Sequence, residues 1–136
     1  MLKVSDLVNE DASLISRRCW SDPQVYELEK QRIFGRAWLF LGHESQIPKP
    51  GDFVQAYMCE TPVILARGQD QGLYASINSC THRGLPVCRA DHGNTKRFVC
   101  PYHNWSFSVE GELMAIPQEN SVCNKPDKSQ LGLKRV

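Results

Sequence analysis

The segments CTH, at residues 80–82, and CPYH, at residues 100–103, decide both the fold and the chemistry expected of this chain. Each segment pairs one thiolate with one imidazole, and each directly follows a predicted strand. Both loops can therefore project from the same end of a small β structure. We predict that four side chains converge there as metal ligands: Cys80, His82, Cys100 and His103.

This pattern favours a [2Fe-2S] cluster of the Rieske type, in which two histidines replace two cysteines on one of the two irons. On that pattern, Cys80 and Cys100 share one iron, and His82 and His103 bind the other. With two thiolates in place of four, the oxidised centre is formally neutral and accepts an electron more easily. The predicted chemistry is one-electron transfer.

Two other interpretations of the same four residues stay open. A structural zinc site also uses two cysteines and two histidines. Zinc fingers, however, group the cysteines together and the histidines together, whereas each loop here contributes one of each. If the four residues bound nothing, two thiols and two imidazoles would crowd adjacent loops in a chain with four histidines in all.

From residue 37 onward, short apolar runs alternate with turn residues, which is typical of small antiparallel strands. The fold class that we predict is mainly β, a small antiparallel barrel or sandwich with two cluster-binding loops and an N-terminal helical arm. The expected strands are residues 38–42, 53–59, 62–67, 73–77, 97–99, 105–109 and 112–116.

The N-terminal arm, residues 1–36, contains one clear helix signal. Asp22 can cap free backbone N–H groups, and Pro23 suits the first helical position, where no N–H is needed. We predict a helix over residues 23–34, which Gly35 ends in a left-handed turn.

Two further segments complete the predicted organisation. Residues 37–118 form the metal-binding domain, and residues 119–136 begin with a polar loop. The last residues, LGLKRV, resume a strand-like pattern, which we interpret as the start of a strand leading to a further domain.

Composition excludes several classes of protein. The 136 residues are 41% hydrophobic and carry 16 basic and 15 acidic side chains, so we expect a globular protein that binds neither nucleic acid nor a membrane. The N-terminus lacks the apolar stretch of a secretory signal, and we expect a cytoplasmic location. In that reducing compartment, six cysteines indicate metal binding more than disulfides.

Beyond the four ligands, longer segments carry a family resemblance: AWLFLGHESQIPKPGDF (37–53), NSCTHRGLPVCRADHGN (78–94), RFVCPYHNWSFSVEGELMAIP (97–117) and the final QLGLKRV. The chain resembles the Rieske domain of the alpha (large) subunit of bacterial aromatic ring-hydroxylating dioxygenases. The resemblance implies a cluster that passes electrons from a ferredoxin or reductase to a mononuclear non-haem iron, where oxygen is activated.

The same resemblance implies a separate catalytic domain and several partner subunits. The non-haem iron belongs to a catalytic domain beyond residue 136, so this chain alone should only transfer electrons. The implied partners are that domain, a beta subunit and other alpha subunits, one of which turns a carboxylate toward His103. Respiratory Rieske proteins have cysteines where Leu85 and Tyr102 stand, and we therefore expect a low-potential centre.

Four residues lie directly beside the predicted ligands. Trp105 can shield the cluster or simply pack in the core. Gly84 can let the backbone approach the cluster, and Arg83 is either a solvated charge or a docking contact. Asn104 replaces the glycine that commonly follows the second histidine; asparagine tolerates a left-handed backbone.

The remaining cysteines and histidines lack ligand spacing. We interpret Cys19, Cys59, Cys88 and Cys123 as ordinary thiols, and His43 and His92 as residues that do not bind iron. Two other functions are retained as alternatives. One is a free-standing Rieske ferredoxin, against which the long N-terminal arm argues, and the other is a zinc-stabilised binding module.

Overall fold

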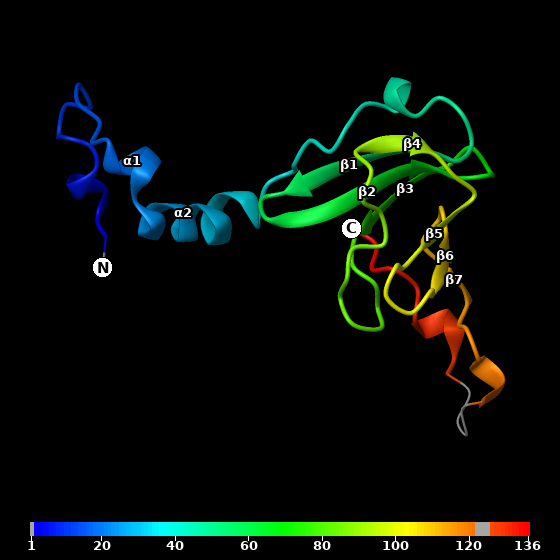
Figure 1. Ribbon diagram of the computed structural model, residues 1–136. Helices are drawn as coiled ribbons and strands as arrows, with labels where there is room; N and C mark the ends of the chain where they lie inside the picture. Colours follow the sequence, from blue (N-terminus) through cyan, green and yellow to red (C-terminus); the bar gives the residue numbers. More distant parts are fainter. Residues whose placement is uncertain (1, 122–125) are drawn as a thin grey trace. The chain divides into compact units, whose positions relative to one another are not determined.

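The structure is a computed structural model that describes residues 2–121 and 126–136 (Figure 1). It consists of two units, Met1–Leu39 and Phe40–Val136, which we describe separately. Cys123 lies outside the described residues, so the prediction of an ordinary thiol there stays a prediction. No helix in the described part of the chain is both long and apolar enough to cross a membrane.

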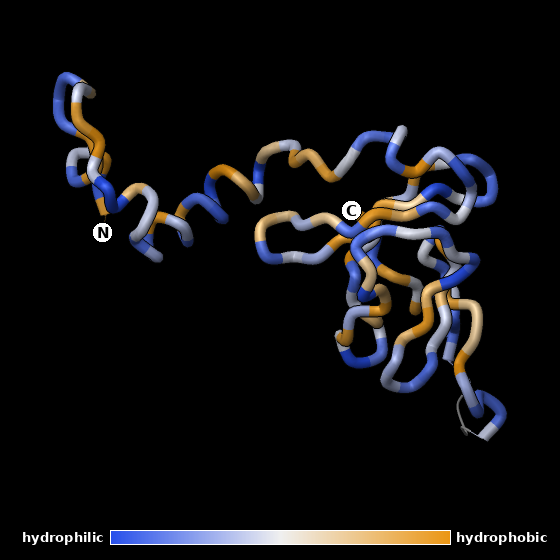
Figure 2. Tube along the Cα trace, turned by 45° about the horizontal axis from the view of Figure 1, so that its top comes forward, coloured by the Kyte–Doolittle hydropathy of each residue, from blue (hydrophilic) through white to orange (hydrophobic). Residues whose placement is uncertain are grey.

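The first unit is helical. It contains the 3-10 helix η1 (Val4–Asp6), the α-helices α1 (Arg18–Ser21) and α2 (Pro23–Glu29), and the π-helical η2 (Lys30–Phe34), which continues α2. The Asp22 side chain accepts a 2.9 Å hydrogen bond from the Gln24 N–H, which confirms the predicted cap. Hydrophilic and hydrophobic residues alternate along this unit (Figure 2).

The end of this helix differs from our prediction. Gly35 does end it, but with a φ of −74° rather than in a left-handed turn. The π-helical turn brings the Gly35 N–H within 2.8 Å of the Lys30 carbonyl oxygen, and a Cβ at Gly35 would lie 2.8 Å from that oxygen. Glycine is used here for close approach of the backbone, not for a left-handed conformation.

The second unit holds two antiparallel sheets (Figure 1). The larger sheet has the order β3-β2-β1-β4, with β1 at Asp52–Met58, β2 at Thr61–Arg67, β3 at Leu73–Ile77 and β4 at His92–Asn94. The smaller sheet has the order β5-β6-β7, with β5 at Arg97–Val99, β6 at Ser106–Ser108 and β7 at Leu113–Ala115. The mainly β prediction is confirmed, and the described strands form no closed barrel.

Three short 3-10 helices lie in the connections of this unit. They are η3 (Glu44–Gln46), η4 (Glu119–Ser121) and η5 (Lys128–Gln130). The final residues, 131–136, run antiparallel to β3, as the bridge between Ser76 and Arg135 shows. The strand-like pattern of LGLKRV thus corresponds to chain that pairs with a sheet edge.

One predicted strand is wrong and one strand was missed. Residues 38–42 form no strand, and Trp38 and Phe40 are exposed, because no neighbouring strand pairs with this apolar run. β4 is His-Gly-Asn, a sequence with low strand propensity, and its pairing with β1 is what makes it a strand. Gly93 faces Phe53 in that pairing, where a Cβ would meet the Phe53 ring at 3.2 Å.

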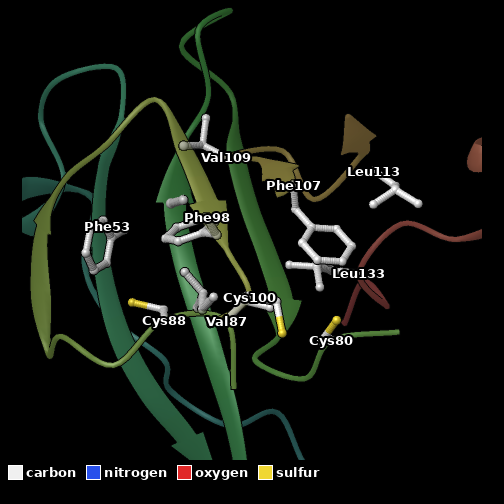
Figure 3. Close-up of a cluster of buried hydrophobic side chains, with 12 residues drawn as sticks. Phe53, Cys80, Val87, Cys88, Phe98, Cys100, Phe107, Val109, Leu113 and Leu133 are labelled. Atoms are coloured by element: carbon white, nitrogen blue, oxygen red, sulfur yellow. The ribbon is translucent and has the colours of Figure 1, made fainter. Parts of the chain in front are cut away.

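The core of the second unit lies between the two sheets and reaches the ends of the metal-binding loops (Figure 3). Phe53 and Phe98 pack edge to face with 5.3 Å between ring centroids, and Phe107 is fully buried. Cys80 and Cys100 belong to the same buried cluster. The predicted thiolate ligands are therefore part of the core itself.

Asn78, just before the first metal-binding loop, is a buried polar residue that closes a turn of chain. Its side-chain oxygen accepts hydrogen bonds from the N–H groups of Val87 (2.9 Å) and Cys88 (3.0 Å). Its amide nitrogen donates to the Cys88 carbonyl (2.8 Å) and to the Gln55 side chain. Residues 78–88 are thereby held as a closed loop around the first cysteine and histidine.

We expect Asn78→Ala to lower the free energy of unfolding by about 3 kcal/mol, because it leaves buried N–H and C=O groups unpaired at about 1–3 kcal/mol each. Asn94→Ala is the matched control: Asn94 is exposed and its loss should cost about 1 kcal/mol or less. Urea unfolding followed by fluorescence measures both. Equal costs would contradict the role given to Asn78.

Candidate metal centre

The first metal-binding loop is closed by two backbone hydrogen bonds. The Cys80 N–H donates to the Leu85 carbonyl (2.9 Å), and the Gly84 N–H donates to the Cys80 carbonyl (2.7 Å). Gly84 has a φ of +78°, in the left-handed region. Hydrogen bonding from the backbone N–H groups of His82 and Arg83 to the Cys80 sulfur favours the thiolate, although burial, the larger effect, raises the pKa of this thiol. The loop thus presents N–H donors to a sulfur atom, as in iron–sulfur sites.

The second loop repeats this closure residue by residue. The Cys100 N–H donates to the Trp105 carbonyl (2.8 Å), and the Asn104 N–H donates to the Cys100 carbonyl (3.0 Å). Asn104 has a φ of +56°, so it takes the left-handed conformation that we expected asparagine to tolerate. The two loops therefore share one backbone design, with the left-handed residue four positions after the cysteine.

The two cysteines form a buried pair. Cys80 is 3% exposed and Cys100 is 2% exposed, and their thiol groups lie side by side, within hydrogen-bonding reach, at the end of the core (Figure 3). Burial raises the pKa of the Cys80 thiol, because a thiolate is poorly solvated there, and the hydrogen bond with Cys100 adds to the effect. Two facing thiolates in this place require a bound cation to offset their charge.

The two histidines form a second pair, nearer the surface. The rings of His82 and His103 meet at 65° with 4.6 Å between centroids. Each is covered by an aromatic neighbour: Trp105 stacks on His82 at 4.8 Å, and Tyr102 stacks on His103 at 3.8 Å. Partial desolvation, together with the charges of His103 and Arg83, lowers the pKa of His82 and favours the neutral, metal-binding imidazole.

One atom of this site has an unmet bonding requirement. The Nδ1 atom of His103 is buried and has no hydrogen-bond partner in the described chain. A buried ring nitrogen without a partner is costly unless a metal ion or a water molecule binds it. Residues 2–121 and 126–136 contain no group of three His, Cys, Asp or Glu side chains around one point. The donors instead form a sulfur pair and a nitrogen pair, the division that a two-iron cluster uses.

The residues beside the ligands divide into those that touch the site and those that do not. Trp105 is half-buried and stacks on His82, so packing and contact with a candidate ligand coincide. Arg83 is exposed. A Cβ on Gly84 would meet only the Ser79 hydroxyl, at 3.7 Å, so this position requires glycine for its backbone conformation rather than for space.

The other cysteines and histidines lie apart from this site. The Cys88 thiol donates to the Ala90 carbonyl at 3.4 Å, and its sulfur points away from the cysteine pair (Figure 3). His43 caps η3 by accepting from the Ser45 N–H, and His92 lies in β4. Cys19 and Cys59 are free, partly buried thiols.

Three residues of the site were missed from the sequence. Asn78 closes the first loop, Tyr102 stacks on His103, and the Thr81 hydroxyl donates to the Leu131 carbonyl at 2.6 Å. Thr81 and Tyr102 lie between predicted ligands, and the sequence pattern gives no sign of these contacts. Only the buried environment of Asn78, which a sequence does not display, distinguishes it from a turn residue.

Residues 37–126 match the Rieske [2Fe-2S] domain, and the chain belongs to this family. Among its relatives, the benzene 1,2-dioxygenase alpha subunit of Pseudomonas putida is 44% identical over 132 residues, covering 95% of this chain and 29% of the relative. The biphenyl dioxygenase alpha subunit of Metapseudomonas furukawaii is 42% identical over 125 residues, or 91% of this chain and 27% of the relative.

Solved structures agree with this assignment. Naphthalene 1,2-dioxygenase with indole bound in its active site superimposes with a TM-score of 0.87 at 40% identity, covering 99% of this chain and 30% of the other. The chain therefore spans less than a third of the length of these three proteins. The predicted resemblance to the Rieske domain of dioxygenase alpha subunits is confirmed, and with it the cofactor class.

The shared backbone design of the two loops predicts that alanine and asparagine at Gly84 have different effects on stability. We expect Gly84→Ala to destabilise the protein by about 1 kcal/mol, because alanine is strained at positive φ while its Cβ finds free space. Gly84→Asn should cost less, because asparagine occupies the equivalent position in the second loop. Thermal unfolding of both variants decides the order, and an asparagine variant less stable than the alanine variant would contradict the shared design.

Proposed function

We propose that Cys80 and Cys100 bind one iron and that His82 and His103 bind the other iron of a Rieske [2Fe-2S] cluster. The observation that carries the proposal is the separation of the four donors into a pair of adjacent thiols and a pair of contacting imidazoles, with His103 Nδ1 buried and unpartnered in the described chain. When bound, such a cluster accepts and returns one electron at a time.

The chain's own residues prepare this site in three ways. Burial of Cys80 and Cys100 excludes water from the sulfur side. The inward N–H groups of His82 and Arg83 stabilise negative charge on the Cys80 sulfur. On the other side, stacking of Trp105 holds the plane of the His82 ring and restricts access of water to it, which is a role in tuning the site as well as in packing.

In the complete protein, we propose that this chain relays electrons from a ferredoxin or reductase to a mononuclear non-haem iron in a catalytic domain. The support is the likeness to alpha subunits of benzene and biphenyl dioxygenases along more than nine-tenths of the chain. Those names make an aromatic hydrocarbon the proposed substrate class. The proposed location is the cytoplasm, and the proposed partners include other alpha subunits and a beta subunit.

The alternatives have less support. A free-standing Rieske ferredoxin does not account for the likeness to oxygenase alpha subunits over 95% of the chain, which includes the N-terminal arm. A zinc-stabilised module does not account for membership of the Rieske [2Fe-2S] family.

We expect the anaerobically purified chain to be red-brown, to contain about two irons and two sulfides, and to show the electron paramagnetic resonance signal of a histidine-ligated cluster after reduction. Cys100→Ser should abolish colour, iron and sulfide. Cys88→Ser is the control, because Cys88 is also buried in the same core but points away from the pair, and it should retain all three. A colourless protein with one zinc would refute the cluster.

A second measurement separates electron transfer from oxygenation. We expect the chain to be reduced by dithionite and reoxidised by oxygen without forming hydroxylated product from benzene, biphenyl or naphthalene, because the proposed oxygen-activating iron is not bound by these four residues. Product analysis by chromatography checks this. Any product formed in step with reoxidation would contradict the assignment of electron transfer alone.

A further inference from the structure

Residues 131–136 run along the edge of β3, immediately before the first metal-binding loop. The Ile77 N–H donates to the Lys134 carbonyl (2.8 Å), and the Val136 N–H donates to the Ala75 carbonyl (3.1 Å). Ile77 is three positions before Cys80. The segment is therefore bonded to the chain directly at the base of this loop.

The same segment is packed as well as hydrogen-bonded. Leu133 is 6% exposed and lies in the buried cluster that contains Cys80, and its N–H donates to the Gly111 carbonyl at 2.7 Å. At Gly132 a Cβ would approach that same carbonyl oxygen to 2.9 Å. The segment is thus closely packed against Gly111, with no space for a side chain at Gly132.

A third contact reaches the loop itself. The Thr81 hydroxyl, between Cys80 and His82, donates to the Leu131 carbonyl at 2.6 Å, across 50 positions of sequence. We propose that Thr81 is a positioning residue that holds the His82 ring in place by anchoring the first loop to residues 131–136. This proposal rests on the proposed function, in which His82 binds iron.

His82 needs such an anchor. Its side chain makes no hydrogen bond within the described residues, and its stacking partner Trp105 is parallel to within 7°. Parallel rings resist tilting but slide over one another at little cost, because the contact area hardly changes. The other bonds of this stretch stay within the loop: backbone bonds fix Cys80 and Gly84, and the N–H groups of His82 and Arg83 bond the Cys80 sulfur. The Thr81 hydroxyl instead bonds the stretch to residues 131–136.

The test uses the cluster-loaded protein. Thr81→Val removes the hydroxyl and keeps the shape of the side chain, whereas Thr81→Ser keeps the hydroxyl. We expect Thr81→Val to broaden the electron paramagnetic resonance signal, shift the reduction potential and speed release of iron to a chelator about fivefold, the equivalent of one hydrogen bond. Thr81→Ser should restore all three properties to those of the unaltered chain.

A second variant tests whether the effect passes through the segment. Gly132→Ala forces residues 131–136 to move away from Gly111, and we expect it to reproduce the spectral change of Thr81→Val. In the Gly132→Ala background, Thr81→Val should add little, since the shared contact is already lost. Full additivity would overturn the proposal.

The outcomes also separate this proposal from the proposed function. If the unaltered chain shows no histidine-ligated cluster signal, the proposed function fails. If the unaltered chain shows the signal and Thr81→Val has the same signal, potential and release rate, the cluster assignment stands and the role of Thr81 is overturned. Failure of Thr81→Ser to rescue would also overturn it, because the hydroxyl would not be the group that matters.

Discussion

Two adjacent cysteine side chains buried in a hydrophobic core are the constraint on which the metal-binding end of the second unit depends. Their sulfurs meet only because each cysteine begins a loop of the same construction, closed by backbone bonds from the cysteine and from the residue four positions later. The short sheet β5-β6-β7 and the edge of β3 supply the two starting points. Burial without charge compensation would oppose folding, so metal binding and the stability of this region are coupled.

Local signals were enough to predict the elements whose conformation is set by adjacent residues. Asp22 starts a helix because its side chain accepts a hydrogen bond from a free N–H, and Pro23 suits the first position because it has no N–H to satisfy. The turns beside β1, β2 and β3 are rich in glycine, proline and aspartate, which favour turns. The cysteine and histidine spacing predicted a two-pronged site, and the structure brings the four side chains together as two pairs.

Features that depend on contacts between residues far apart in the sequence could not be predicted from it. Residues 38–42 have the composition of a strand, but a strand also needs a partner, and no strand in the described part of the chain pairs with them. β4 is the opposite case: its composition does not favour a strand, and His92 and Gly93 adopt strand geometry because they pair with β1. The bond from Thr81 to Leu131 joins residues 50 positions apart and leaves no periodicity in the sequence.

The unequal burial of the two ligand pairs gives the proposed centre a direction. Its sulfur side faces packed phenylalanine, valine and leucine side chains, which offer an electron no acceptor, whereas the imidazole side reaches the surface at His82. An external donor or acceptor can approach only one pole of the cluster closely. Electron tunnelling falls steeply with distance. The fold therefore favours electron exchange through the histidine side of the proposed centre and insulates its cysteine side.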